Sequence, residues 1–252
     1  MEASLIYHGL DVTYQALISK ILKANQRDVG HKAPYYFYSG AKLAISLDRA
    51  PLLLARRVPW RPLEKELSCW IDRGMTRPEQ FEDEGLKFYE GVCKPGQLIP
   101  YGGWKRQYER AIKELMVNPS SKKIILDIPS VWESAHFYPG CIRSIQFFVH
   151  NSTLHSHVYI RSSDVALGLP CDIWQMGQLT RRAQTEVGFE RAVLNLYIAN
   201  AHIYTDHIAG LQQLGERPLK GMRYPEWKPG SYTLDDPDSY QPHPAIPFTF
   251  HK

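Results

Sequence analysis

The sequence contains little cysteine and no long apolar run. Its four cysteines, Cys69, Cys93, Cys141 and Cys171, include no Cys-x-x-Cys pair, so a zinc site or a dithiol redox motif is not expected. No stretch of about 18 apolar residues is present, so we expect no membrane span. The opening MEASLIYHGL lacks the basic start and apolar core of a signal peptide. These absences lead us to expect a cytoplasmic protein with free thiols.

The chain also lacks a block of like charges. Its 30 basic and 26 acidic residues give a net charge of +4, without the basic stripe that is typical of proteins that bind nucleic acids. We therefore expect no nucleic-acid partner. The small excess of positive charge suits a small ligand that carries phosphate.

The hydrophobic pattern predicts one α+β domain over residues 1–252, because no repeat, low-complexity tract or linker interrupts it. Gly40 is expected to bend a strand, and Gly74 is expected to be the C-cap of a helix. The predicted helices cover residues 12–25, 60–73, 105–117, 173–187 and 202–214, and the predicted strands cover residues 35–47, 123–128, 145–151, 153–163 and 192–200.

Cys141 lies in the segment YPGCIRSIQFFV, in a Pro-Gly turn before an apolar run. A cysteine in this place is either a nucleophile or a small packed hydrophobe. The nucleophile needs a cationic or donor-rich setting, because the thiolate is the reactive form. Arg143 is a candidate cation, because alternate residues of a strand share one face.

A second candidate segment is RSSDVALGLPCD. Arg161 and Ser162 could grip an anion, because a guanidinium group binds phosphate through two parallel hydrogen bonds. Asp164 and Asp172 flank a Leu-Gly-Leu-Pro turn, where Gly168 would admit a ligand close to the backbone. Taken alone, the segment is better explained as a surface turn with solvated aspartates.

Two further polar segments have simple structural explanations. AHIYTDH places His202, Tyr204 and His207 near a junction between a strand and a helix, but a structural histidine is the usual outcome. No HExxH spacing occurs, so no metal site is expected. PSSKKIIL places Lys122 and Lys123 before a strand, where solvated lysines are the default.

Considered together and in order, these segments resemble the thymidylate synthase family. PGC followed by QFFV, then RSSDVALGLP, then AHIYTDH follow one another as in the family. Upstream, APLLLARRVPWRPLEKEL, LIPYGGW and AIKELMVNPSSKK are similar to family segments, and SYQPHPAI is similar to a segment near the family's end. The resemblance extends from about residue 27 to residue 247, nearly the whole chain.

The resemblance implies a fold with a mixed sheet and flanking helices, and a homodimer formed by sheet-to-sheet packing. It implies that a one-carbon unit passes from 5,10-methylenetetrahydrofolate to C5 of a pyrimidine nucleotide. By resemblance, Cys141 is the thiolate that adds to C6 of the base, which makes C5 nucleophilic. Glu66 is similar to a glutamate that organises proton transfer and water, and Tyr101 is similar to an active-site tyrosine.

The same resemblance assigns residues to the nucleotide phosphate. Arg161 and Ser162 match the pair that binds it, and Arg27 belongs to the N-terminal phosphate loop. Lys122 and Lys123 replace two arginines that reach the phosphate site of the partner subunit. Lysine keeps the charge of arginine but loses its planar fork of donors.

The sugar and the folate are assigned in the same way. His202 and Tyr204 resemble the residues that hold the sugar 3′-hydroxyl group. Asp164 resembles the carboxylate that holds the pterin, and Gly168 and Tyr89 are expected on the folate side of the site.

Asp172 departs from the family pattern. The family has an asparagine here, which reads O4 and N3–H of uracil. Cytosine presents the opposite pattern, and a carboxyl group can accept from its N4 amino group and share a proton with N3. Ile142 and Ile160 also replace polar residues of the family. These changes resemble deoxycytidylate hydroxymethylases, so we expect a cytidine nucleotide, dCMP or CMP.

Two segments favour hydroxymethylation over methylation. Where the methylating family has a second tryptophan, this chain reads FYEGV over residues 88–92. The family's C-terminus APVAV closes over the site and excludes water, and it becomes IPFTFHK here. Both changes favour the addition of water, although Phe248 or Phe250 could form another lid.

Three alternatives stay open. The chain could be a dCMP C5-methyltransferase, or a dUMP-specific enzyme whose Asp172 is protonated in a dry site. It could also be an inactive paralogue that binds a nucleotide. The joint presence of Cys141, the Arg-Ser pair, Asp164 and the His-Tyr pair disfavours this last alternative.

Overall fold

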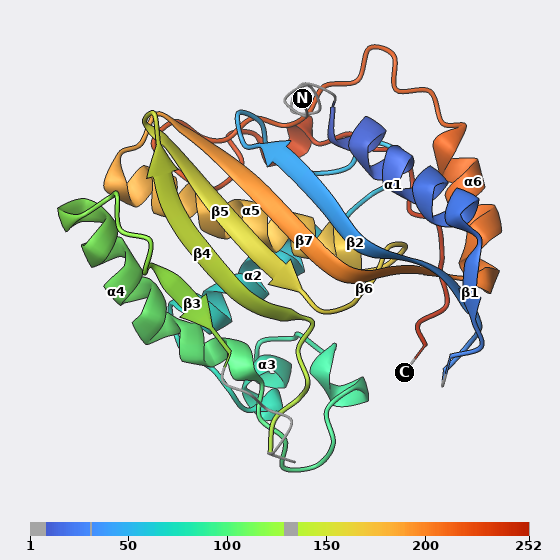
Figure 1. Cartoon of the computed structure of the whole chain (residues 1–252), viewed down its shortest axis with the longest axis horizontal. Helices are drawn as coiled ribbons and strands as arrows, with labels where there is room; N and C mark the ends of the chain where they lie inside the picture. Colours follow the sequence, from blue (N-terminus) through green and yellow to red (C-terminus); the bar gives the residue numbers. More distant parts are fainter. Residues whose placement is uncertain (1–8, 31, 129–135, 252) are drawn as a thin grey trace.

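The computed structural model describes residues 9–30, 32–128 and 136–251 (Figure 1). The opening segment MEASLIYH and His31 of the expected phosphate loop lie outside these residues. None of the helices in the described residues has both the length and the apolar character needed to cross a membrane.

The described residues form six α-helices and four short 3-10 helices, which accompany the strands of one sheet. The α-helices are α1 (Leu10–Ala24), α2 (Trp60–Ile71), α3 (Pro78–Asp83), α4 (Trp104–Val117), α5 (Gly168–Val187) and α6 (Ile208–Gly215). The 3-10 helices are η2 (Tyr89–Gly91), η3 (Pro100–Gly103), η4 (Thr205–His207) and η5 (Pro237–Ser239). The strands are β1 (Gln26–Asp28), β2 (Tyr35–Ser46), β3 (Ile125–Asp127), β4 (Ile142–His150), β5 (Thr153–Ile160), β6 (Ser163–Asp164) and β7 (Arg191–Tyr204).

The strands form a mixed sheet in the order β1-β2-β7-β5-β4-β3, and β6 pairs with β7 beside this path. β5 and β6 run parallel to β7, and the other pairs are antiparallel. A parallel pair needs a long crossover, and α5 forms the crossover between β5 and β7. This architecture confirms the expected α+β fold with a mixed sheet and flanking helices.

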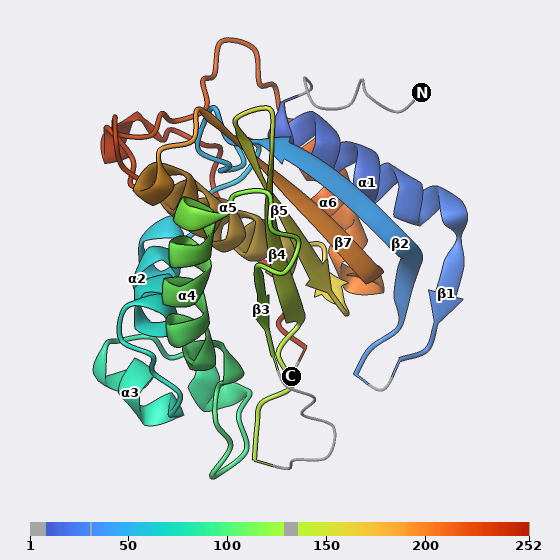
Figure 2. The same ribbon diagram turned by 60° about the vertical axis from the view of Figure 1, so that its left-hand side comes forward.

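The two faces of the sheet have different surroundings. Leu154, Val158 and Leu194 are fully buried on the face that packs against α5, which lies behind β5 and β7 in Figure 1. Figure 2 shows α2, α4 and α5 together on one side of β3, β4 and β5. On the opposite face, His157 and Tyr197 are only half-buried. One face of the central strands is therefore left without a helix layer.

Two predicted elements have other boundaries than expected. Residues 202–204 continue β7 instead of starting a helix, and Tyr204 pairs with Tyr35 of β2. Helix α5 begins at Gly168, so the expected Leu-Gly-Leu-Pro turn is its first turn. Pro170 is tolerated there because the first helical amides have no acceptor within the helix. α3 was not predicted from the sequence.

Two glycines that the sequence singles out have a left-handed backbone. Gly40 has a φ of 73° and is skipped in the pairing of β2 with β7, although the register is the same on both sides of it. Gly74 has a φ of 64° but is not the predicted cap, because α2 ends at Ile71 and its C-cap is Asp72. Both φ values lie in the left-handed region, which glycine enters without steric strain.

The buried carboxylate of Asp11 ties α1 to the segment before α2. It accepts hydrogen bonds from the backbone amides of Leu54 (3.0 Å) and Ala55 (2.8 Å). The hydroxyl group of Tyr224 donates to it at 2.8 Å. Asp11 is fully buried, so three donors depend on it for their hydrogen bonds.

We expect Asp11→Ala to lower the free energy of unfolding by about 3 kcal/mol, because buried amides lose their acceptor. Urea denaturation followed by circular dichroism measures this change. Asp235→Ala is the matched control, because Asp235 is exposed. An equal effect of the two substitutions would contradict this role of Asp11.

Candidate active site

The loop that carries Cys141 is held by Arg161, which lies just beyond the end of β5. Arg161 Nη2 donates to the carbonyl oxygen of Pro139 at 2.6 Å, and Nε donates to that of Gly140 at 3.1 Å. The backbone amide of Arg161 donates to the carbonyl oxygen of Cys141 at 2.9 Å. The guanidinium group therefore fixes the loop and places a positive charge near the thiol.

Tyr101 of η3 holds the other side of this loop. Its hydroxyl oxygen accepts from the backbone amide of Ile142 at 3.2 Å. A Cβ atom on Gly140 would overlap the hydroxyl group of Tyr101, so only glycine allows this approach. Tyr101 thus contacts the residues on both sides of Cys141.

The Cys141 thiol is partly buried among groups of both signs. Burial raises its pKa, and the charge of Asp172 raises the pKa further. Arg161 and Lys32 act in the opposite direction. Arg143 does not take the expected place, because its guanidinium group donates to a backbone carbonyl at 3.4 Å. The thiol needs further help to ionise near neutral pH.

Asp172 lies in the second turn of α5 and faces β6. Ser163 Oγ donates to Asp172 Oδ2 at 3.3 Å. Burial raises the pKa of Asp172 to about 7, and the charge of Glu66 raises it further, against the hydrogen bond from Ser163. Near neutral pH this carboxyl group is therefore present in both its protonated and its ionised form.

Glu66 of α2 is held by two side chains from other elements. Gln175 Nε2 of α5 donates to Glu66 Oε2 at 2.7 Å. The hydroxyl group of the buried Tyr89 is also hydrogen-bonded to Glu66. Burial raises the pKa of Glu66, and these two hydrogen bonds lower it. Tyr89, expected on the folate side, thus has its hydroxyl group on Glu66.

Asp164 lies opposite His202 in the pairing of β6 with β7. Asp164 Oδ1 accepts from the backbone amide of Ala166 at 2.9 Å, in the turn that leads into α5. The same oxygen lies 3.7 Å from Nδ1 of the buried His207. One oxygen of this carboxylate thus fixes the local backbone.

A group of aromatic rings surrounds His202 at the end of β7. The ring centroids of Tyr35 and Tyr204 lie 5.3 Å and 5.2 Å from that of His202. His202 Nδ1 lies 3.1 Å from Asn200 Oδ1 and 3.4 Å from Ser162 Oγ. Burial lowers the pKa of His202, so a neutral imidazole is favoured. A neutral ring can bind a hydroxyl group through one nitrogen atom.

Three predicted residues lie apart from this group. Arg27 is exposed on β1, at one edge of the sheet, and Lys122 and Lys123 are exposed just before β3, at the other edge. Among the described residues, no hydrogen bond or ion pair links their side chains to Cys141 or its neighbours. Gly168 has open space beside it, since a Cβ atom there would meet only Ser163 Oγ, at 3.9 Å.

Arg56 and Lys32 are site residues that we did not predict from the sequence. Arg56 is 6% exposed and donates to the carbonyl oxygen of Ala166, while its Nε has no partner in the part of the chain that the structure describes. No carboxylate within these residues forms an ion pair with Arg56. A buried, unpaired guanidinium group is suited to an anionic ligand. The only sequence signal for it was the ARRV motif.

The thiol of Cys141, the carboxyl groups of three half-buried residues (Glu66, Asp164 and Asp172) and two guanidinium groups therefore converge at the ends of β4, β5, β6 and β7. Perturbed pKa values on converging side chains are typical of active sites. A thiol beside a guanidinium group that acts to lower its pKa is a candidate nucleophile for covalent catalysis.

Comparison with known proteins agrees with an enzyme that uses covalent catalysis. The family model described as thymidylate synthase matches residues 12–249, so the chain belongs to the thymidylate synthase family. This family uses 5,10-methylenetetrahydrofolate as a co-substrate. Its members bind a nucleotide and a folate, which makes the chain a thymidylate synthase-like enzyme.

Three relatives are named thymidylate synthases, and each is 27% identical to this chain. The protein of Encephalitozoon cuniculi aligns over 254 residues, which cover 82% of this chain and 85% of the relative. That of Equine herpesvirus 2 covers 78% of this chain and 82% of its own length. The alignment with the Homo sapiens protein covers 79% of this chain and 76% of that protein.

We expect the charges around Cys141 to control how fast iodoacetamide alkylates it. Asp172→Asn should speed alkylation at pH 8 by about threefold, because it removes a charge that raises the thiol pKa. Lys32→Gln should slow it, because Lys32 lowers the same pKa. Mass spectrometry of peptides separates Cys141 from the other three cysteines. Equal rates in all three proteins would contradict this electrostatic account.

Proposed function

We propose that this protein is a C5-hydroxymethyltransferase for a cytidine nucleotide, dCMP or CMP. It would use 5,10-methylenetetrahydrofolate and yield the 5-hydroxymethyl nucleotide and tetrahydrofolate. The observation that carries the proposal is the carboxyl group of Asp172, which accepts a hydrogen bond from Ser163 Oγ at 3.3 Å and whose pKa is raised to about 7 by burial. This residue stands where the family resemblance places the base-reading asparagine.

The chemistry of Asp172 suits cytosine. The N4 amino group of cytosine donates, and its N3 accepts. A carboxyl group with a pKa of about 7 can accept from N4 with one oxygen and share a proton with N3 through the other. Uracil presents a carbonyl oxygen and an N–H at the same two positions, so an ionised carboxylate would repel its O4.

Cys141 is the proposed nucleophile. Its thiolate forms a bond to C6, and electron density moves to C5, which then bonds the incoming carbon. A proton shared between Asp172 and N3 makes C6 more electrophilic and also removes a negative charge that disfavours the thiolate. Loss of the C5 proton would break the bond between the new carbon and the folate nitrogen, which releases tetrahydrofolate and leaves an exocyclic methylene group. Water would add to this group, and the S–C6 bond would then break and expel the thiolate.

Arg161 and Ser162 are the proposed phosphate ligands. Arg161 uses Nε and Nη2 to hold the Cys141 loop, which leaves Nη1 without a partner among the described residues. His202 and Tyr204 would hold the sugar 3′-hydroxyl group, because the neutral imidazole of His202 can donate or accept. Phosphate binding would then bring the nucleotide directly against the loop of the nucleophile.

The described residues also fit a folate. Asp164 uses Oδ1 for backbone amides, and its second oxygen can accept from an N–H group of the pterin. Arg56 offers a buried, unpaired Nε to an anionic part of the ligand. When bound, the folate supplies the one-carbon unit. Glu66, held by Gln175, is placed to order the water that adds to this carbon.

Methylation of dCMP is the alternative, and the C-terminal tail favours it. The Phe248 ring lies 5.0 Å from His207 and 5.2 Å from the guanidinium carbon of Arg56. Phe250 lies 5.8 Å from Phe88. The tail therefore packs on the walls of the site, and it could exclude water as a lid does. The argument for hydroxymethylation consequently depends mainly on residues 88–92, which lack the second tryptophan of the methylating family.

The open face of the sheet is the surface that we propose for a homodimer. Phe148, His155, His157 and Tyr197 form a row of stacked rings across this face, which we call the aromatic row. Such a half-buried face suits a second copy of the same sheet. In this dimer, the exposed Lys122 and Lys123 would complete the phosphate site of the partner, which explains their distance from Arg161 within one chain.

We expect Asp172→Asn to shift the kcat/KM preference from dCMP toward dUMP by about 100-fold, because an amide donates to O4 and accepts from N3–H. Competition assays with both nucleotides measure this ratio. Asp235→Asn, an exposed change, is the control and should leave it unchanged. An Asp172→Asn enzyme that still prefers dCMP would disprove that Asp172 reads the base.

We expect the dimer to weaken as the pH falls from about 7 to 5. Burial lowers the pKa of His157 below 6.5, and the charge of His155 lowers it further. This lowered pKa belongs to the single chain. Covering the face in a dimer would desolvate the imidazole further, so the dissociated state would bind more protons and the dimer would weaken as the pH falls through the pKa of the single chain. Analytical ultracentrifugation measures the effect, and His157→Gln should reduce it. A dimer of constant stability over this range would contradict the proposed interface.

A further inference from the structure

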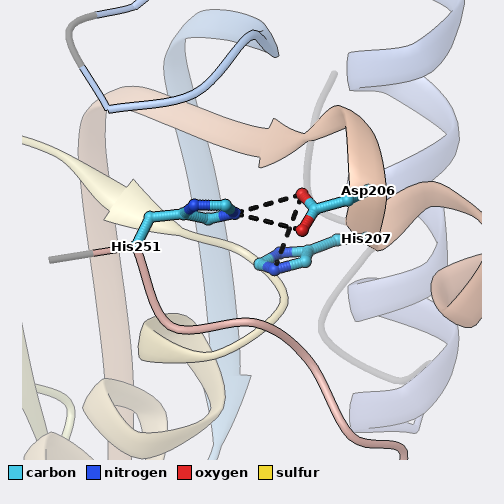
Figure 3. Close-up of side chains that lie close together, drawn as sticks. All are labelled: Asp206, His207 and His251. Atoms are coloured by element: carbon cyan, nitrogen blue, oxygen red, sulfur yellow. Dashed lines mark hydrogen bonds and ion pairs between the residues drawn. The ribbon is translucent and has the colours of Figure 1, made fainter.

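The last described residues, 246–251, form an extended C-terminal tail whose end is held by polar contacts. His251 Nε2 lies 3.1 Å and 3.2 Å from the two carboxylate oxygens of Asp206 (Figure 3). The neighbouring His207 donates from Nε2 to the carbonyl oxygen of Thr249 at 2.9 Å. Lys32 Nζ donates to the carbonyl oxygen of His251 at 3.3 Å. We call the side chains of Asp206, His207 and His251 the clasp.

The tail also packs against residues of the candidate active site. The His251 ring lies 4.3 Å from that of Tyr204, which we propose as a sugar ligand. On the other side, His207 Nδ1 lies 3.7 Å from Asp164, the proposed pterin ligand. The clasp therefore connects the tail to both proposed ligand sites.

The donor atoms of the clasp lie within 4.8 Å of one another, a spacing that metal ligands also show. However, His207 Nε2 points its proton at a carbonyl oxygen, and Nδ1 faces the Asp164 carboxylate. Nε2 therefore has no lone pair to offer, and Nδ1 has none once it carries a proton, which the raised pKa of His207 favours. Hydrogen bonds and charge, instead of a metal ion, account for the contacts that the structure shows.

We propose that the clasp is a latch that holds the C-terminal tail against Tyr204 and Lys32, and that Asp206 and His251 are positioning residues for the active site. Only the identity of the ligands beneath the tail rests on the proposed function. The latch itself is defined by contacts within this chain.

The charges that face the clasp make its strength depend on pH. Burial would lower the pKa of His207, but Asp164, the carbonyl group of Thr249 and Asp206 together raise it. Burial would likewise raise the pKa of Asp206, but the bonds and charges of His251 and His207 lower it. Lys32 and Tyr204 are the other ionisable groups that face the clasp.

The sign of the dependence follows from His207. The carbonyl group of Thr249 raises the pKa of His207 only when the tail is in place, whereas Asp164 and Asp206 act on it in both states, so the hydrogen bond to Thr249 links latching to protonation of His207. The latch is therefore strongest where His207 is protonated and weakens as the pH rises through the raised pKa. It weakens again only in strong acid, where Asp206 takes up a proton.

Gly210 of α6 allows a test that leaves the tail sequence unchanged. A Cβ atom on Gly210 would lie 2.6 Å from a ring carbon of Phe248 and 3.0 Å from Ile246, so Gly210→Ala must push these two side chains of the tail away from α6. Gly215→Ala is the matched control, because it adds a methyl group to the same helix with nothing within 4 Å. Asp206→Ala removes the acceptor of His251 directly.

The readout is the rate at which a serine carboxypeptidase shortens the full-length protein, followed by mass spectrometry. We expect Gly210→Ala and Asp206→Ala to be shortened on the order of tenfold faster than wild type, and Gly215→Ala at the wild-type rate. The ratio of the Asp206→Ala rate to the wild-type rate should fall between pH 6 and pH 8. A merely structural role would not produce this pH dependence.

Equal rates in wild type, Asp206→Ala and Gly210→Ala would overturn the latch. Faster shortening of wild type after EDTA treatment would also overturn it, because a metal ion would then hold the tail. The assay contains neither nucleotide nor folate, so its failure is separate from a failure of the proposed function. If the latch positions the active site, Asp206→Ala should also raise the KM for the nucleotide more than it lowers kcat.

Discussion

The burial of the Asp172 carboxyl group is the constraint on which the proposed chemistry depends. Moving an ionised carboxylate out of water is unfavourable, so the group either takes up a proton or finds a partner that shares one. Its charge also raises the pKa of Cys141. A cytidine nucleotide that shares a proton with Asp172 would satisfy this carboxyl group and favour the thiolate at the same time. Base recognition and activation of the nucleophile would thus be one event.

The fold brings these two groups together by simple means. Cys141 immediately precedes β4, and Asp172 lies near the start of the helix that crosses from β5 to β7. Arg161 joins the two regions, because it follows β5 and donates to the Cys141 loop. The short strand β6 then aligns Asp164 with His202. The site therefore forms at the edge of the sheet where β4 begins and where β5, β6 and β7 end.

Much of the fold could be predicted from local patterns. The amphipathic helix α4 and the strand β2 with its kink at Gly40 have the expected positions. The start of α5 was not predicted, because Gly168 and Pro170 are also typical turn residues. Residues 202–204 extend β7 through pairing with β2, which local sequence does not encode. Tertiary pairing determined the end of this strand.

The site was predictable to the extent that motifs mark it. Cys141, Arg161, Asp164, Asp172 and His202 lie together, as their order in the sequence suggested. Arg56, Lys32 and the clasp depend on contacts between segments far apart in the chain, such as the 2.9 Å bond from His207 to Thr249. No spacing rule reports such contacts. These contacts form only in the folded protein, where the C-terminal tail packs against η4.

The most direct test of the proposed function is the mass of the nucleotide product. The wild-type protein would be incubated with 5,10-methylenetetrahydrofolate and an equal mixture of dCMP, CMP and dUMP. Our account predicts a gain of CH₂O on a cytidine nucleotide, and the product would also identify the sugar. A gain of CH₂ on dCMP would show that methylation occurs and that the argument from residues 88–92 is wrong. Modification of dUMP alone would contradict the central claim that Asp172 selects cytosine.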